Sequence, residues 1–127
     1  MINLQTLLAV AIGGAAGSVA RFVVGVWSTR ALGDGFPWGT LFINVSGSFL
    51  IGLFVELFAL HWDAPQPMRV FLAVGICGGY TTFSTFSLDT YVLIERGQYG
   101  FAATYVAASV IGSIAALVGA LHLLRAV

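Results

Sequence analysis

The sequence predicts an all-α membrane protein in which one domain, residues 1–127, contains four transmembrane helices. Two observations support this fold class. Only 8% of the residues are charged and 59% are hydrophobic, whereas a soluble domain carries roughly 25% charged residues. The chain also contains four apolar stretches that each exceed the roughly 20 residues that a helix needs to cross a bilayer. With a formal net charge of zero, the chain lacks the basic surface that nucleic-acid binding requires.

The first predicted helix covers residues 4–28. The N-terminal sequence "MINLQTLLAV", which includes the start of this helix, lacks the basic region of a cleaved signal peptide, so we expect the helix to remain in the mature protein. Small residues recur in it at intervals of four, as Gly13 with Gly17 and Gly14 with Ser18. Such a small face lets a second helix approach closely.

The other three predicted helices cover residues 37–60, 68–94 and 100–124. Pro37 suits the first turn of the second helix, where its missing N–H costs nothing. Pro65 and Pro67 end one loop and begin the third helix. Single glycines predict further small faces in the second and fourth helices, at Gly47, Gly52, Gly112 and Gly119.

Four helices place both termini and the loop 61–67 on one side of the membrane. That side carries Arg69 and Arg125, and the other side carries Arg30 and Arg96. Because the balance of basic residues sets orientation, equal numbers predict a dual topology in which copies insert both ways. Opposed copies could then form an antiparallel homodimer with closed two-fold symmetry. Alternatively, a partner or the surrounding lipid sets one orientation.

The third predicted helix contains the sequence GICGGYTTFSTFS, residues 75–87. Its adjacent glycines and adjacent threonines are poor helix formers, so we expect the helix to be broken near 78–82. Inside a membrane a break is tolerated only where protein or water satisfies the freed backbone groups. Freed carbonyl groups on a dimer axis would suit a monovalent cation such as Na⁺. The alternative is a kink that serine and threonine side chains absorb.

Two of the predicted helices each carry a line of polar side chains along one face, here called a polar stripe. Polar side chains are costly in lipid and tend to face a bundle interior or a water-filled path. The stripes offer hydroxyl, phenol and amide donors without a carboxylate or histidine, which suits a small anion better than a cation. Hydrogen bonding between helices is the alternative role. The stripes consist of Thr40, Asn44 and Ser48 in the second helix and of Tyr105, Ser109 and Ser113 in the fourth.

Two phenylalanines, Phe83 and Phe86, follow the expected break and share a helix face. Aromatic pairs at this spacing usually serve packing. The edge of a phenyl ring, however, carries the positive end of its quadrupole and can face an anion. Ser84 and Ser87 lie on a neighbouring face and add donors.

Charged residues inside the predicted helices are few. We expect Arg21 to make a structural pair or to face a vestibule, and Asp89 to face an aqueous mouth. Glu56 is the remaining acid well inside a helix. We find no nucleophile–base pair, phosphate-binding loop or metal-ligand spacing in the sequence, so the chain is not expected to be an enzyme.

Taken together, "GICGGYTTFSTFS", "GTLFINVSGSFLIG" upstream and "YVAASVIGS" downstream resemble the Fluc/CrcB family of bacterial fluoride channels. The resemblance covers essentially the whole chain in length, helix layout and motif order. It implies an antiparallel dual-topology homodimer in the cell inner membrane, with two fluoride pores and a buried structural Na⁺ at the dimer centre. It also implies passive, selective export of fluoride from the cytoplasm.

The resemblance assigns roles to individual residues. Gly78 and Thr81 match the positions whose backbone carbonyls hold the sodium ion, and Arg21 matches the arginine of the first helix. This chain has Asp89 where relatives often have Glu, so its carboxylate is one methylene shorter. The positions that match the pore or lie on the associated polar segment are Asn44, Phe83, Ser84, Thr85, Phe86, Tyr105, Ser109 and Ser113.

Two other functions fit a short chain with four membrane helices. A small multidrug transporter coupled to protons would rely on an acidic residue in its first helix, but that helix contains Arg21 and no Asp or Glu. A non-transporting assembly subunit would use its polar stripes only to join helices. Transport by the purified protein in liposomes separates the three functions.

Overall fold

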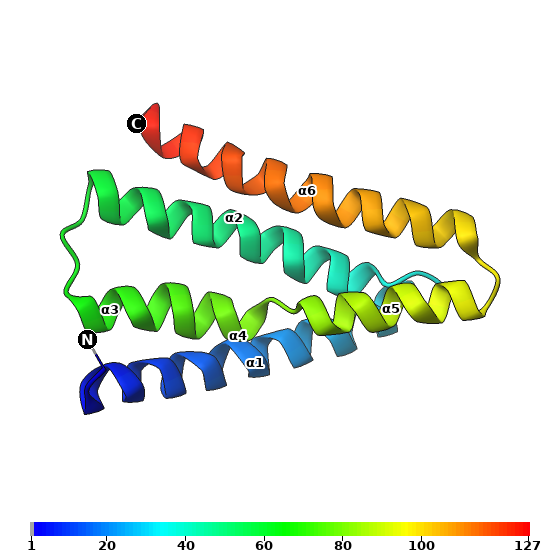
Figure 1. The fold of residues 1–127 in the computed structure, drawn as a ribbon, viewed down its shortest axis with the longest axis horizontal. Coiled ribbons are helices and arrows are strands. Elements are labelled where there is room, and N and C mark those ends of the chain that lie inside the picture. Colours follow the sequence, from blue (N-terminus) through cyan, green and yellow to red (C-terminus); the bar gives the residue numbers. More distant parts are fainter. Residues whose placement is uncertain (1) are drawn as a thin grey trace.

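The helices of the computed structural model, which describes residues 2–127, run roughly side by side and are joined by short loops (Figure 1). Within that range there are four helical segments long and apolar enough to cross a membrane, which confirms the four predicted helices. The first is α1 (Leu4–Leu32), the second is α2 (Trp38–Leu60) and the fourth is α6 (Tyr99–Arg125). The described residues contain no β-strand.

Helix α1 extends beyond its predicted end at residue 28. Asn3 and Thr6 form a capping box at its start, which satisfies backbone N–H groups that have no partner within the helix. The residue that follows the helix is the C-cap Gly33, whose positive φ of 78° glycine adopts without strain. Pro37 precedes α2 as its N-cap residue, one position before the expected first turn.

The third segment, Gln66–Glu95, is not one regular helix. It is built from α3 (Gln66–Arg69), a π-helical stretch η1 (Val70–Cys77), α4 (Gly78–Tyr80) and α5 (Phe83–Glu95). Between α4 and α5 the backbone is extended at Thr81 (φ −81°, ψ 156°) and Thr82 (φ −153°, ψ 117°). The predicted break is therefore confirmed, and it is shorter than expected because residues 78–80 remain helical.

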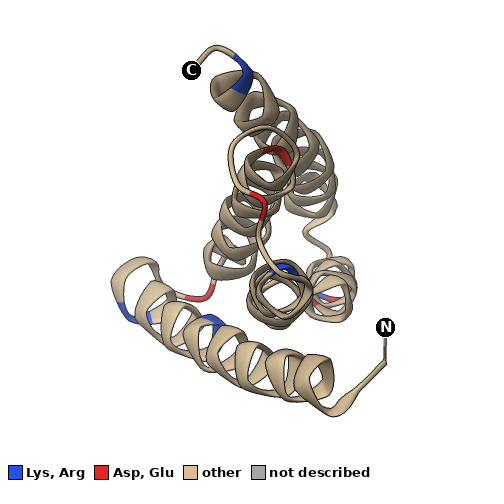
Figure 2. Cartoon of the chain, turned by 90° about the vertical axis from the view of Figure 1, so that its left-hand side faces the viewer, with Lys and Arg blue, Asp and Glu red and all other residues tan. Residues whose placement is uncertain are grey.

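Both chain ends and the α2–α3 loop lie at one end of the molecule, and the other two loops lie at the opposite end (Figure 1). The structure thus confirms which loops share a side. Seen from the first of these ends, the helices carry few charged residues, and α1 runs obliquely to the others (Figure 2).

Glycines bring α1 against the third segment. A Cβ atom at Gly17 would collide with the carbonyl oxygen of Ile76, and one at Gly79 would lie 2.5 Å from the carbonyl oxygen of Gly14. The close packing predicted at Gly13 and Gly17 is confirmed, whereas Ser18 is exposed and the space at the Cβ position of Gly14 is open. A Cβ at Gly52 would likewise lie 2.8 Å from the carbonyl oxygen of Leu117, between α2 and α6. Gly119 does not follow this pattern, because the space at its Cβ position is open.

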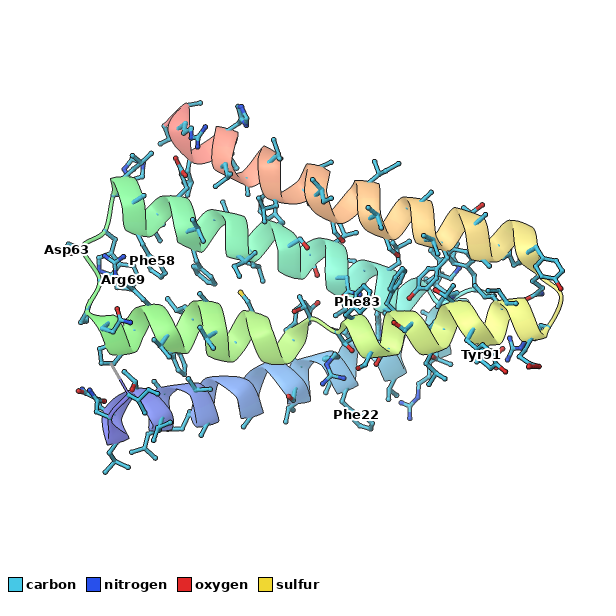
Figure 3. The ribbon with its side chains drawn as sticks, viewed as in Figure 1. Phe22, Phe58, Asp63, Arg69, Phe83 and Tyr91 are labelled. Carbon is cyan, nitrogen blue, oxygen red and sulfur yellow. The ribbon has the colours of Figure 1, made fainter. Side chains whose placement is uncertain are left out.

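Large apolar side chains cover the outside of the molecule. Phe22 is 70% exposed and Ile111 is 69% exposed, and Figure 3 shows Phe22 pointing away from the other helices. Extended apolar surface of this kind is rare on soluble monomers. Lipid is therefore the solvent that suits this surface.

Candidate functional site

The break in the third segment is held by the side chain of Asn44, from the second turn of α2. Its Nδ2 donates a hydrogen bond to the carbonyl oxygen of Thr82 (3.0 Å), and its Oδ1 accepts one from the N–H of Thr82 (2.8 Å). One amide side chain thus satisfies both backbone groups of an extended residue. This is the protein-supplied satisfaction that a helix break inside a membrane requires.

Two more side chains hold the other side of the break. Arg21 Nε donates a hydrogen bond to the carbonyl oxygen of Gly79 (3.1 Å), so the partner of this side chain is a backbone carbonyl. The hydroxyls of Ser46 and Tyr80 lie 3.0 Å apart and share a hydrogen bond. The break is therefore fastened to both α1 and α2.

The carbonyl groups within the break fall into two sets. Those of Cys77, Gly79 and Thr82 each accept a hydrogen bond. Among residues 2–127, no side chain or loop N–H group donates a hydrogen bond to the carbonyl oxygen of Gly78 or of Thr81. Free carbonyl oxygens are suitable ligands for a hard cation, so the two positions named for sodium fit that ion. The described chain contains no group of three or more His, Cys, Asp or Glu side chains that could hold a metal instead.

A groove of about 420 Å³ lies between α2, the break, α5 and α6. Its walls are mostly apolar, and polar groups from three separate segments converge on it. The structure thus brings together most of the residues predicted for the pore and the ion site. Those lining the groove are Asn44, Ser48, Gly78, Thr81, Phe83, Phe86, Ser109 and Ser113.

The two phenylalanines form part of this groove from the first turn of α5. Their ring centroids lie 5.4 Å apart with an interplanar angle of 49°. Phe86 also packs against Tyr105 at 5.2 Å, whereas the Phe83 residue is 78% exposed. Figure 3 shows Phe83 beside α2 near the break. Phe86 is therefore held by the protomer, and Phe83 is presented outward.

Ser109 is the most distinctive polar residue of the groove. It is only 6% exposed, and its buried hydroxyl has no hydrogen-bond partner among the described residues. Most buried polar side chains are paired, so an unpaired one indicates strain or a function. A donor in the groove wall, free of any protein acceptor, remains available to a ligand.

The remaining predicted pore residues lie elsewhere. Thr40 and Thr85 line a second cavity of about 690 Å³ between α1, α2 and α5. Tyr105 is fully buried and lines neither cavity. Ser84 is exposed, also lines neither, and lies 3.3 Å from the Thr82 hydroxyl. The polar stripe of α2 is consequently divided, with Thr40 in one cavity and Asn44 and Ser48 in the other.

Asp89 and Arg21 both line the second cavity. Asp89 Oδ2 accepts a hydrogen bond from the Tyr105 hydroxyl at 3.0 Å. This bond joins the wall of the second cavity to the ring that packs against Phe86. The shorter carboxylate of aspartate therefore still reaches the fourth helix.

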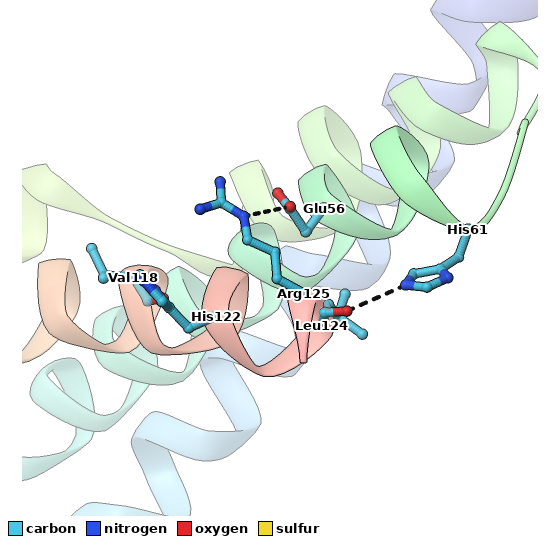
Figure 4. A network of polar contacts seen from close by, with 6 residues as sticks. All are labelled: Glu56, His61, Val118, His122, Leu124 and Arg125. Carbon is cyan, nitrogen blue, oxygen red and sulfur yellow. Dashed lines mark hydrogen bonds and ion pairs between the residues drawn. The ribbon is translucent and has the colours of Figure 1, made fainter. Parts of the chain in front are cut away.

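An ion pair that was not predicted from the sequence joins the C-terminal ends of α2 and α6. Arg125 Nε lies 2.7 Å from Glu56 Oε1, and the Glu56 side chain is only 9% exposed (Figure 4). His61 adds a contact of 3.3 Å to the carbonyl oxygen of Leu124. A carboxylate inside a membrane helix needs a partner, so Glu56 was itself the signal for this pair.

Comparison with known proteins identifies the family. Residues 8–121 match the family profile described as CrcB-like protein, Camphor Resistance (CrcB). The chain is 60% identical over 119 residues to the "Fluoride-specific ion channel FluC 1" of Nitrobacter hamburgensis, covering 94% of each chain. It is 60% identical over 121 residues to "Fluoride-specific ion channel FluC" of Nitrobacter winogradskyi, covering 95% of this chain and 96% of the relative.

A third relative is more distant but is covered almost completely. The chain is 55% identical over 125 residues to "Fluoride-specific ion channel FluC" of Agrobacterium fabrum, covering 98% of each chain. These proteins are named as channels and not as enzymes, in agreement with a sequence in which we find no catalytic motif. The profile, these relatives and the four apolar helices show that this chain is a multi-pass membrane protein of the CrcB family.

Proposed function

We propose that the protein is a fluoride-selective, passive ion channel. The relatives that align with nearly the whole chain are named as fluoride-specific ion channels. Its groove combines hydroxyl and amide groups with two phenyl rings and has no carboxylate in its lining. Such a lining can replace the water around a small anion while offering little to a cation.

The observation that carries the proposal is the unpaired hydroxyl of Ser109 in the wall that Phe86 shares. A buried hydroxyl without a partner costs about 1–3 kcal/mol, which a ligand that accepts its hydrogen bond would offset. The positive edge of a phenyl ring can contribute a second favourable contact to an anion. Donors and ring edges together compensate for the tightly held water that fluoride loses.

The direction of transport follows from the membrane potential. A negative interior is worth about 2.3 kcal/mol per unit charge per 100 mV, and it drives an anion outward. HF that enters from acidic surroundings dissociates in the cytoplasm and leaves fluoride there. A passive pore in the cell inner membrane therefore suffices to export it.

The assembly proposed is an antiparallel dual-topology homodimer with two pores. The number of arginines near the helix ends is equal on the two sides, which removes the usual bias on orientation. Gly78 and Phe83 are exposed beside the break, and a second copy would cover them. A two-fold axis there would bring the free carbonyls of Gly78 and Thr81 close to those of the partner.

Those carbonyl groups are the proposed ligands of a structural Na⁺ at the dimer centre. When bound, the ion supplies a fixed positive charge that needs no titratable side chain. Arg21 and Asn44 hydrogen-bond the neighbouring carbonyls of Gly79 and Thr82. The hydrogen bonds of the break thereby leave the two proposed ligand oxygens free.

Efflux from liposomes tests the proposal. The purified full chain is reconstituted into vesicles loaded with the potassium salt of fluoride or of chloride. A potassium ionophore is then added, so that potassium efflux balances the charge of the released anion, and anion release is followed with ion-selective electrodes. We expect fast electrogenic release of fluoride and none of chloride. Equal release of both anions would exclude a fluoride-selective channel, proton-linked drug uptake would indicate a transporter, and a lack of all transport would indicate an assembly subunit.

A further inference from the structure

Helix α2 runs beside the break in the third segment and contacts it at two neighbouring points (Figure 1). At the first, Asn44 hydrogen-bonds both backbone groups of Thr82. At the second, one turn further along α2, the buried Gly47 lies against the side chain of Thr81. A Cβ atom at position 47 would collide with the methyl carbon of Thr81, Cγ2. Gly47 therefore leaves a recess in the surface of α2 that receives this methyl group.

The other groups of Thr81 are fixed from within the third segment. Its N–H donates a hydrogen bond to the carbonyl oxygen of Cys77 at 3.0 Å, and its hydroxyl donates one to the same oxygen at 2.9 Å. The hydroxyl and the methyl group are the two branches of one Cβ atom, so these contacts together fix the χ1 angle. The Thr81 carbonyl group takes no part in either contact, and its direction follows from them.

We propose that Gly47 is a positioning residue for the Thr81 carbonyl, and thereby for the cation site between two copies of the chain. This role rests on the proposed structural Na⁺. The ligands of an ion have to be held within about 0.5 Å of their productive positions. Gly47 can do so without touching the ion, because it sets how closely Thr81 approaches α2.

A methyl group at position 47 would leave Thr81 two ways to avoid it. Rotation about χ1 would move Cγ2 away but would break the hydrogen bond of the hydroxyl to Cys77. A shift of the backbone away from α2 would keep that bond but would carry the carbonyl oxygen with it. Either response loosens or displaces the proposed ligand oxygen, so Gly47→Ala is expected to weaken the binding of Na⁺.

Thermal unfolding of the purified full chain in detergent, measured over a range of Na⁺ concentrations, tests this proposal. N-methyl-D-glucamine chloride keeps the ionic strength constant, and tryptophan fluorescence follows unfolding. Gly47→Ala is expected to need at least about tenfold more Na⁺ than wild type for half of the stabilisation, the usual loss when a group that orients a metal ligand is changed. An unchanged Na⁺ requirement in Gly47→Ala would overturn the proposal.

Serine at position 81 separates the contact with Thr81 from the other neighbour of Gly47, the ring of Tyr80. Cδ2 of that ring lies 3.2 Å from the Cβ position of residue 47. Thr81→Ser removes only Cγ2 and keeps the hydroxyl. In the Thr81→Ser background, Gly47→Ala is therefore expected to leave the Na⁺ requirement unchanged. An increase as large there as in the wild-type background would assign the collision to Tyr80 and overturn the role of Gly47 toward Thr81.

Gly52→Ala is the matched control on the same helix. A Cβ atom there would lie 2.8 Å from the carbonyl oxygen of Leu117, so this variant also disturbs close packing, but against α6 and not against the break. It is expected to unfold at a lower temperature with an unchanged Na⁺ requirement. An increase equal to that of Gly47→Ala would show a general effect of destabilisation and overturn the proposal.

The response of the wild type separates the role of Gly47 from the ion site itself. A wild type that gains no stability from Na⁺ would overturn both. A wild type that does gain stability, with Gly47→Ala needing no more Na⁺, would overturn the role of Gly47 alone. If Gly47→Ala does not fold, folding of the double variant with Thr81→Ser would support the contact, and its failure to fold while Thr81→Ser folds would overturn it. None of these measurements depends on fluoride conduction.

Discussion

Asn44 and Thr82 are joined by two hydrogen bonds, of 3.0 Å and 2.8 Å, that use both ends of one side-chain amide. The pair resembles the bonding between two adjacent β-strands, made here by a side chain. Its consequence is positional, since α5 begins at the next residue with Phe83. Asn44 thereby fixes where the phenyl rings enter the groove, and one of its N–H groups remains for a ligand.

Replacing Asn44 tests this role. Asn44→Asp keeps the acceptor for the Thr82 N–H but loses the donor to the Thr82 carbonyl, which is left unsatisfied. We expect a loss of about 1–3 kcal/mol of stability, measured as thermal unfolding of the detergent-purified protein. Ser48→Ala, one turn further along the same face, removes no hydrogen bond of the described chain and should change stability by less than about 0.5 kcal/mol. Equal unfolding temperatures for the two variants would contradict the proposed role.

The contact between α1 and the third segment depends on glycine. Gly17→Ala places a methyl group against the carbonyl oxygen of Ile76 and 2.8 Å from the N atom of Tyr80. Because backbone atoms cannot move aside as side chains do, we expect a destabilisation of about 1–3 kcal/mol. Gly25→Ala is the control on the same helix, where the Cβ position is open. If Gly17→Ala unfolds no more easily than Gly25→Ala, the two helices are not in such close contact.

The ion pair between Glu56 and Arg125 should be worth more than a surface pair. Arg125→Gln leaves a carboxylate that is only 9% exposed without its partner, and exposed pairs contribute at most about 1 kcal/mol. We therefore expect Arg125→Gln to lower the unfolding temperature more than Asp63→Asn, which removes only the ion pair of the fully exposed Asp63 with Arg69 and leaves the hydrogen bond from Arg69 to the Ala64 carbonyl in place.

The double variant Glu56→Gln, Arg125→Gln sharpens this test. It removes both charges, so the buried carboxylate no longer lacks a partner, and part of the stability lost in Arg125→Gln should return. Additive losses in the double variant would show that the two side chains do not interact.

Much of the fold follows from sequence because the bilayer leaves few choices. Apolar stretches of about 20 residues identify the helices, and the glycine and threonine pairs locate the break. The exact break could not be read from residues 75–87 alone, because its position depends on Asn44 and Arg21 from other helices. Propensity marks where a helix is weak, and tertiary hydrogen bonds decide which residue leaves it.

The candidate site could be predicted only in part from the sequence, because its shape also depends on contacts between helices. Helical spacing placed Ser109 and Ser113 on one face, and both line the groove with Asn44 and Ser48. The spacing also grouped Thr40 with Asn44, although these residues face different cavities. A stripe defined on one straight helix does not reveal where a neighbouring helix, here the broken third segment, divides the space in front of it.

Ser109 distinguishes a functional hydroxyl from a structural one. Ser109→Ala removes a buried group without a partner, so we expect unchanged or slightly higher stability. If the hydroxyl binds fluoride, its loss removes a hydrogen bond to a charged group, worth about 1.5–3 kcal/mol, and fluoride efflux from liposomes should fall by roughly tenfold or more. Lower stability with normal efflux would assign the hydroxyl to the fold.

The phenyl rings provide the most direct test of how the groove treats an anion. Phe86→Ile and Phe83→Ile each keep an apolar side chain but remove a ring edge. A contact of this size contributes about 0.5–1.5 kcal/mol, so each variant should lower fluoride efflux between roughly twofold and tenfold. Phe83→Ile should leave protomer stability unchanged, because Phe83 is 78% exposed. Phe86→Ile should also cost stability, because its ring packs against Tyr105.

Flux, chloride leak and dimer content should be measured on the same preparations. If chemical cross-linking shows that the proposed dimer is intact, slower fluoride efflux without chloride leak places the rings beside the ion. The Tyr105 contact explains why Phe86→Ile needs this check, since a distorted groove would also slow the flux. Phe83 does not pack against Tyr105, and its ring pairs with that of Phe86 while remaining 78% exposed. Efflux at the wild-type rate from Phe83→Ile would therefore contradict a contact between ring edges and fluoride.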